Sequence, residues 1–182
     1  MLYCGDCGHK LVKKIPAMDN RVRDVCTHCD AIFYANPKVI VGVLPTWQGK
    51  VLLCKRAIEP RMGFWTLPAG FLENGESTLE GAIRETYEEA GAQLTPPLFY
   101  RLFDIPWINQ VYLFYRAELS SAEYHKGEES LDVNLFKQQD IPWENLAFPI
   151  MKQILQEYFQ DSSAGVFQIR TGLPSERLSS IK

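Results

Sequence analysis

Hydrophobic and polar positions divide the chain into a short polar segment and a longer patterned one. Residues 1–36 contain few apolar side chains and many turn residues, so they cannot bury a core without a further constraint. Proline disfavours helix at the residue before it, and Asn36 precedes Pro37. We therefore predict a small module at 1–36, a main domain at 37–160 and a polar tail at 161–182.

The pattern of the main domain predicts strands on both sides of a central helix. Apolar runs at 39–44 and 50–56 flank a turn and indicate a hairpin. Further strands are expected at 98–103, 110–119 and 133–136, and helices at 78–90 and 149–159. These elements predict an α+β fold in which a mixed sheet lies between helices, as an α-β-α sandwich.

The central helix has clear start and stop signals. Ser77 followed by Glu80 forms a capping box that starts the helix at Thr78, and Gly91 is placed to end it. Helical spacing predicts a core-facing side, with Tyr87 at its edge. The residues of that side are Leu79, Ala82, Ile83, Thr86 and Ala90.

Charge and hydropathy exclude some classes of protein. The formal net charge of -3 argues against a dedicated nucleic-acid binder, which usually has a basic excess. No apolar run reaches the length of a membrane span, and the N-terminus lacks the pattern of a signal peptide. We expect a cytoplasmic protein with no membrane partner.

Four of the five cysteines form two C-x2-C pairs, Cys4 with Cys7 and Cys26 with Cys29. Two such turns close a tetrahedron around Zn²⁺, and four thiolates leave no open position, so the zinc is expected to be structural. The alternative is free or disulfide-bonded cysteines. The fifth, Cys54, lies in an apolar run and is interpreted as a small buried hydrophobic residue.

The charge of this module gives little attraction for nucleic acid. Residues 1–38 hold six basic and four acidic side chains, and the zinc with four thiolates would offset that excess. A packing or dimer role is therefore favoured for the module, and a homodimer is left open.

Three acids converge on one face of the central helix. Glu85, Glu88 and Glu89 are spaced i, i+3, i+4, and two of them lie near the helix end whose dipole disfavours anions. A cation would offset both penalties, and oxygen-only ligands suit Mg²⁺ or Mn²⁺. The alternative is a solvated acidic face.

The spacing of residues around this helix resembles the signature of the Nudix hydrolases. The resemblance covers about 37–160, and the cysteine module resembles the zinc ribbon of the NADH-pyrophosphatase-like branch. It implies a mixed-sheet Nudix fold with a small N-terminal zinc ribbon. The sequence departs from the signature at Thr86 and Ala92, which are normally bulky aliphatic residues. The matching residues are Gly70, Glu76, Arg84, Glu85, Glu88, Glu89 and Gly91.

The resemblance implies roles by position. Glu85 and Glu89 would be the principal ligands of the catalytic Mg²⁺ or Mn²⁺, with the Gly70 carbonyl as another, and Glu88 would be a further ligand or orient water. Glu76 and Arg84 would hold the loop and helix together.

A later acidic loop is expected to complete the catalytic set. Glu129 is favoured there, then Asp132, with Glu128 also open, and a solvated acidic loop is the alternative.

Substrate contacts are predicted from basic and aromatic residues. The phosphate candidates are Arg56 and Arg61, with Lys55. The candidates for stacking on an adenine ring are Phe64 and Trp107, with Tyr112 and Phe33. The alternatives are surface cations and core aromatics.

Segments 104–112 and 140–148 resemble zinc-ribbon Nudix proteins that act on FAD and ADP-ribose, and the S-Q-P-W-P-F-P-x-S array of NADH pyrophosphatases is absent. The resemblance therefore implies a metal-dependent pyrophosphohydrolase that cleaves a small-molecule ADP-X nucleotide to AMP and X-phosphate. The alternatives are an NADH pyrophosphatase, a non-catalytic nucleotide-binding sensor and a zinc-ribbon nucleic-acid adaptor.

Overall fold

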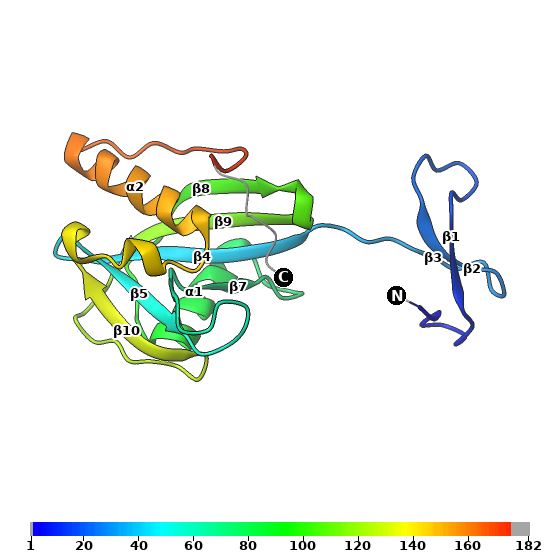
Figure 1. Cartoon of the computed structure of the whole chain (residues 1–182), viewed down its shortest axis with the longest axis horizontal. Helices are drawn as coiled ribbons and strands as arrows, with labels where there is room; N and C mark the ends of the chain where they lie inside the picture. Colours follow the sequence, from blue (N-terminus) through cyan, green and yellow to red (C-terminus); the bar gives the residue numbers. More distant parts are fainter. Residues whose placement is uncertain (1, 176–182) are drawn as a thin grey trace. The chain divides into compact units, whose positions relative to one another are not determined.

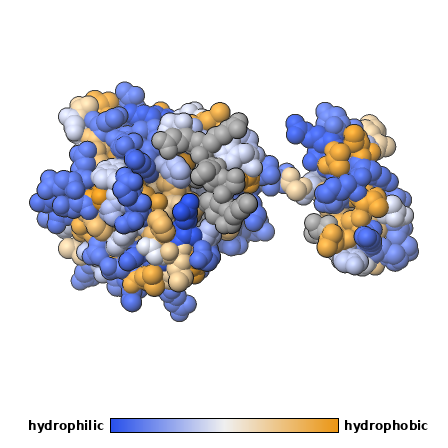
Figure 2. Space-filling view, in the orientation of Figure 1, coloured by the Kyte–Doolittle hydropathy of each residue, from blue (hydrophilic) through white to orange (hydrophobic). Residues whose placement is uncertain are grey.

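A computed structural model describes residues 2–175, and its chain contacts separate two units, Met1–Pro37 and Lys38–Lys182 (Figure 1). The first unit is an antiparallel sheet of three short strands, in the order β1 (Leu11–Lys14), β2 (Arg23–Cys26) and β3 (Ile32–Phe33). Among its described residues, the buried hydrophobic ones are Cys4, Leu11, Val25 and Cys26, and other apolar side chains reach its surface (Figure 2). Among the described helices, none is long and apolar enough to cross a membrane.

The second unit is built on a mixed seven-stranded sheet with main-path order β10-β5-β4-β9-β8. The central pair β4 and β9 is parallel, and the other pairings are antiparallel. Its strands are β4 (Lys38–Trp47), β5 (Lys50–Arg56), β6 (Trp65–Thr66), β7 (Ala69–Phe71), β8 (Leu98–Ile105), β9 (Gln110–Glu118) and β10 (Ser130–Phe136). Its helices are α1 (Thr78–Ala90) and α2 (Pro149–Ala164), with 3-10 turns η1 (Pro106–Ile108), η2 (Gln138–Asp140) and η3 (Trp143–Asn145).

Alternation along the central strands buries both faces of the sheet. On β4, Val41 and Val43 pack with Ala82 of α1, whereas Leu44 packs with Ile150 and other residues of α2. Successive side chains of a strand point to opposite faces, so the two helices cover opposite sides of the sheet. The predicted α-β-α arrangement with a mixed sheet is confirmed.

The hairpin strands β4 and β5 separate away from their turn. They are paired only next to Gln48 and Gly49, whose positive φ angles suit the tight turn of a two-residue hairpin. Further along, β4 pairs with β7 and β5 pairs with β6, so these two short strands fill the gap. The hydrophobic pattern of the sequence alone does not reveal these two short strands. They place Gly70, in the middle of β7, at the opening between β4 and β5.

Helix α1 begins and ends as the capping signals predict. Ser77 and Glu80 form both bonds of the capping box, and Gly91 ends the helix in the left-handed conformation. The predicted core side is partly wrong, because Ile83 is exposed and Glu89 is buried. Apart from Glu89, the buried stripe consists of the small residues Gly81, Ala82, Thr86 and Ala90, which allow α1 to lie close against the sheet and turn Ile83 outward.

The chain after α2 is more ordered than the polar pattern of 161–182 suggests. Helix α2 continues to Ala164, beyond the predicted end at 159, because Asp161 is buried and binds Tyr100 and Arg170. Arg170 then forms a bridge beside Arg101 of β8. Residues 176–182 of the expected tail lie outside the described residues.

Candidate active site and zinc centre

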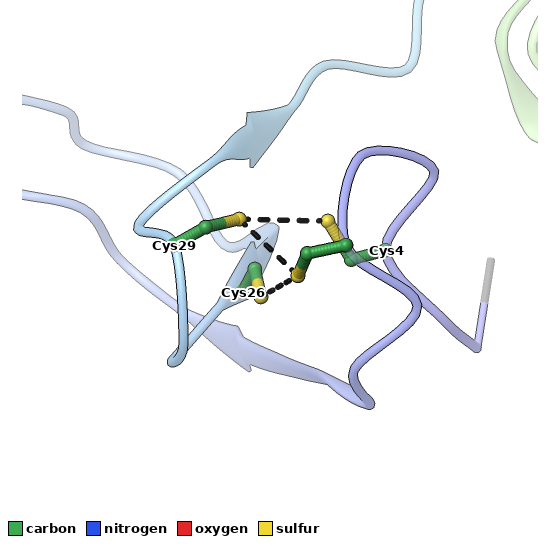
Figure 3. A group of neighbouring side chains, drawn as sticks. Cys4, Cys26 and Cys29 are labelled. Carbon is green, nitrogen blue, oxygen red and sulfur yellow. Dashed lines mark hydrogen bonds between the residues drawn. The ribbon is translucent and has the colours of Figure 1, made fainter.

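The four paired cysteines of the first unit converge (Figure 3). The sulfur of Cys7 lies 3.5 Å from those of Cys26 and Cys29, and Cys4 and Cys29 are 3.7 Å apart. A tetrahedral zinc with Zn–S bonds of about 2.3 Å requires sulfur separations of about 3.8 Å, so this set fits Zn²⁺. All five cysteines are free of disulfide bonds, and Cys54 is buried as predicted.

The backbone of the second cysteine turn favours a thiolate. The N–H groups of Cys29 and then His28 donate to the Cys26 sulfur and lower its pKa to about 6. His28 stacks on His9 with ring centroids 3.7 Å apart, beside the four sulfurs. Because the sulfurs already complete a tetrahedron, the two imidazoles are not needed as ligands.

The second unit contains a cleft of about 1270 Å³ where β4 and β5 separate. One part of its wall is acidic and the other is mainly apolar. The acidic part is formed by Glu73, Glu85, Glu88, Glu89, Glu128 and Glu129. The apolar part includes Ile40, Ile58, Ile108, Tyr112, Phe148 and Met151.

Arg84 fastens the loop before α1 to the helix. Its Nε and Nη2 donate to both oxygens of Glu76 at 3.0 and 2.7 Å, and Nη2 also donates to the Phe71 carbonyl. Its Nη1 reaches Glu85 at 2.8 Å and Glu88 at 3.0 Å. Arg84 therefore holds the pKa of Glu76 down at about 2 and ties the end of β7, together with the loop that follows it, to α1.

The negative charges of Glu85 and Glu89 are not fully offset by neighbouring positive charges or hydrogen bonds. Burial raises the pKa of Glu89 to about 8, and the neighbouring Glu85 carboxylate adds to the rise. Burial likewise raises the pKa of Glu85, although Arg84 opposes it. The Oε2 atom of Glu89 is buried without a hydrogen-bond partner among the described residues. A divalent cation would supply the missing positive charge, so these residues fit a metal.

Gly70 lies directly against the Glu85 carboxyl group. A Cβ atom at position 70 would overlap that carboxylate, so any other residue here would displace the Glu85 side chain from its present position. Glu88 differs from the other two acids of the helix, because its carboxylate is exposed and binds Arg84 one turn earlier. The three acids line one cleft, with Glu85 and Glu89 innermost.

Two of the three acids that were candidates for completing the catalytic set lie at the cleft. Glu128 and Glu129 line it, and the charge of Glu129 contributes to the raised pKa values of Glu85 and Glu89. Asp132 instead accepts hydrogen bonds from the Val133 backbone and the Asn134 amide.

Of the four predicted substrate-binding residues, only Arg56 is among the residues that line the cleft. Its Nε donates to the Pro60 carbonyl at 2.9 Å, and its guanidinium lies 5.5 Å from the Phe148 ring centre. Arg61 lies over the Phe64 ring, outside the lining set. Trp107 packs against the main core of the unit.

Of the three remaining substrate-contact candidates, one lines the cleft and two lie outside the lining set. Tyr112 lines the cleft, and its hydroxyl donates to Gln110 at 3.0 Å. Lys55 lies over Trp65, and Phe33 belongs to the first unit.

Part of the apolar wall was missed by the sequence analysis. Phe148 and Met151 come from the start of α2, and Ile58 and Pro60 come from the loop after β5. None of these four residues was predicted as a site residue. No local sequence signal shows that the start of α2 meets the end of β5.

The chain was compared with known families and proteins. Residues 36–158 match the family model of the NUDIX domain, and residues 2–35 match the zinc-ribbon model described as Nudix N-terminal. A crystal structure of a NUDIX hydrolase from Nitrosomonas europaea has 44% sequence identity and a TM-score of 0.91. The match covers 95% of this chain and 98% of that one.

Among curated proteins, the NAD-capped RNA hydrolase of Pectobacterium carotovorum is 26% identical over 143 residues. Its counterpart in Yersinia enterocolitica is 27% identical over 143 residues. The matches cover 77% of this chain and 52% of each relative, so the chain spans about half the length of these proteins. The domain match covers more than half of the chain, which therefore belongs to the Nudix hydrolase family.

Proposed function

We propose that the protein is a metal-dependent pyrophosphohydrolase that cleaves an ADP-X nucleotide, of the FAD or ADP-ribose type, to AMP and X-phosphate. The observation that carries this proposal is that a buried Glu89 and a partly buried Glu85, both with raised pKa values, share one cleft with an apolar wall. A diphosphate needs cations, and the groups attached to it need largely apolar contact.

Each acid has a proposed role. Glu85, Glu89 and the Gly70 carbonyl would hold Mg²⁺ or Mn²⁺, and Glu88 would be a further ligand or orient water. When bound, the ion neutralises the diphosphate and makes water a better nucleophile. Glu129 would accept the proton of the attacking water as its oxygen bonds to phosphorus and the bridging P–O bond breaks.

The mainly apolar part of the cleft suggests how the nucleotide is oriented. Arg56 is the basic residue placed to meet a phosphate oxygen, since it lines the cleft beside Glu89 and is held by Pro60. Tyr112 and Phe148 provide aromatic surface for a flat ring. Phe64, Arg61 and Trp107 remain proposals that would require side-chain movement toward the substrate.

A second candidate substrate is NAD(H), free or at the end of an RNA. The curated relatives are named NAD-capped RNA hydrolases, and NAD is also an ADP-X compound with a central diphosphate. The missing downstream array argues for the FAD or ADP-ribose type.

A substrate panel tests the proposal. FAD, ADP-ribose, NADH, NAD, NAD-capped RNA and nucleoside triphosphates are incubated with Mg²⁺ or Mn²⁺, and the products are separated by chromatography. We expect AMP release from FAD or ADP-ribose, abolished by a chelator. Preferred cleavage of NAD or its RNA would support the second candidate. Tight binding without cleavage of any compound would contradict both and indicate a sensor.

A further inference from the structure

The loop between β9 and β10 is bonded to the last turn of α1. The backbone N–H of His125 donates to the Ala90 carbonyl at 2.9 Å, and that of Gly127 donates to the Glu89 carbonyl at 3.0 Å. The last carbonyls of a helix have no partner within the helix. The loop therefore caps the end of α1 that carries the acids.

This contact leaves no space for a side chain at position 127. A Cβ atom there would overlap the backbone carbonyl oxygen of Glu88. Gly127 is not among the residues with positive φ, so glycine is needed here for space and not for backbone conformation. The obstructing atom belongs to the helix backbone, so only a shift of the loop or of the last turn would relieve the overlap.

The loop that contacts α1 reaches the cleft directly after Gly127. Glu128 and Glu129 follow directly and line it. The Glu129 carbonyl accepts from the backbone N–H of Ala57 at 2.8 Å, so a second anchor holds the same short segment at the end of β5. The position of Glu129 thus depends on how closely the loop approaches α1 on one side and β5 on the other.

We propose that Gly127 is a positioning residue for the reaction. By allowing the loop to meet the Glu88 and Glu89 backbone, it sets the position of the Glu129 carboxylate relative to Glu85 and Glu89. This inference rests on the proposed function, in which Glu129 accepts a proton from the attacking water.

The first test is the Gly127→Ala variant in the full-length, zinc-containing protein. We expect kcat to fall roughly 10- to 100-fold, because a misplacement of about 1 Å can cost about 100-fold, while KM changes little. The control is Lys126→Ala, an exposed neighbour in the same loop, which should keep the parent kcat. A parent-like kcat for Gly127→Ala would overturn the proposal.

A double variant separates positioning from general damage. If Gly127 acts through Glu129, then Gly127→Ala combined with Glu129→Gln should be no slower than Glu129→Gln alone. If the fold losses in kcat of the two single variants multiply in the double variant, Gly127 acts through a group other than Glu129. Full activity of Glu129→Gln alone would also overturn the inference, because the position of the Glu129 carboxylate would then have no effect on kcat.

A second variant is available if Gly127→Ala does not fold. Ala57→Pro removes the N–H that binds the Glu129 carbonyl, and Arg56, the last residue of β5, already has the extended backbone that precedes proline well. It should show the same fall in kcat and the same non-additivity with Glu129→Gln. Parent-like turnover in this variant would count against the two-anchor arrangement.

A metal-binding measurement distinguishes failure of this inference from failure of the proposed function. Mn²⁺ binding is followed by water-proton relaxation in the parent, Gly127→Ala and Glu129→Gln proteins. If the parent cleaves no nucleotide but both variants change the Mn²⁺ signal alike, the positioning stands and the reaction is rejected. If only Glu129→Gln changes the signal, the positioning is rejected.

Discussion

The acids of α1 have different environments although they share one helix face. Glu89 is buried beneath the cleft, Glu85 touches Gly70, and Glu88 is exposed beside Arg84. A carboxylate that is buried without full compensation costs free energy in the metal-free protein. Substitution by a neutral amide of the same shape should therefore separate metal binding from folding.

We predict that Glu89→Gln loses turnover but not stability. Changes to groups that only hold a metal ligand in place commonly cost about 10- to 100-fold, so loss of a ligand itself should lower kcat by roughly 100-fold or more. The melting temperature with chelator present should equal or exceed that of the parent, because the charged form is disfavoured by burial. Exposed Glu118→Gln is the control. Unchanged Mg²⁺-dependent activity would contradict the assignment.

At the scale of elements, α1 shows which predictions depend on local signals. Its ends followed from Ser77, Glu80 and Gly91, whose bonds lie within the helix and its flanks. The exposure of Ile83 could not be predicted in this way, because it depends on how closely α1 packs against β4. The hydrophobic pattern around Gly70 also predicts no strand, because β6 and β7 are short and are defined by their pairing with β5 and β4.

The sequence departure at Thr86 gives a prediction for α1. Its buried hydroxyl donates to the Ala82 carbonyl one turn earlier, a bond that does not strengthen the helix. Thr86→Val keeps the volume and should change the free energy of unfolding by no more than about 1 kcal/mol, in the stabilising direction. Thr86→Ser, which leaves a space for a methyl group, should cost about 1 kcal/mol. Urea unfolding measures both, and a large loss in Thr86→Val would contradict this account.

The end of α2 gives a prediction that depends on pH. Arg170 is the main cause that lowers the pKa of Asp161 from 3.8 to about 2. A lowered pKa means that the ionised group stabilises the fold above pH 3.8, and that this stabilisation is lost as the pH falls toward 2.

Asp161→Asn should therefore destabilise the second unit by about 2 kcal/mol at neutral pH, and the difference from the parent should shrink below pH 4. The control is Asp140→Asn, which changes an exposed acid. Thermal unfolding from pH 7 to pH 2.5 provides the measurement. A difference that stays constant over this range would contradict the prediction.

On the scale of the whole molecule, the two units have separate sources of stability. Among the described residues, the buried hydrophobic set of the first unit is Cys4, Leu11, Val25 and Cys26, whereas the second unit has a continuous core between the sheet and α2. The cysteine spacing was enough to predict that the four sulfurs converge, because in a zinc ribbon the metal takes the place of a core. Of the cleft, the sequence predicted most of the acidic part, which includes the signature acids, and the lining residues Arg56 and Tyr112. Its mainly apolar part joins residues far apart in sequence, such as Ile40 and Met151.

We predict that Cys26→Ser removes the zinc and unfolds the first unit only. The bound zinc should fall from about one equivalent toward none by elemental analysis. The calorimetric transition of the second unit should stay within a few degrees of the parent. A ribbon that keeps its fold without zinc, or a second unit that unfolds with it, would contradict separate stabilisation.

The separation of β4 and β5 has a consequence for how such an enzyme can diversify. The segment around Gly70 is hydrogen bonded into the sheet through β6 and β7, so the metal-facing groups rest on a fixed framework. The facing wall comes from loop 57–60, η1 and the start of α2. Under the proposed function, side-chain substitutions at Ile58, Ile108 or Met151 would change which group X is accepted without moving the groups that handle the diphosphate. One chemistry can thus be kept while its range of substrates changes.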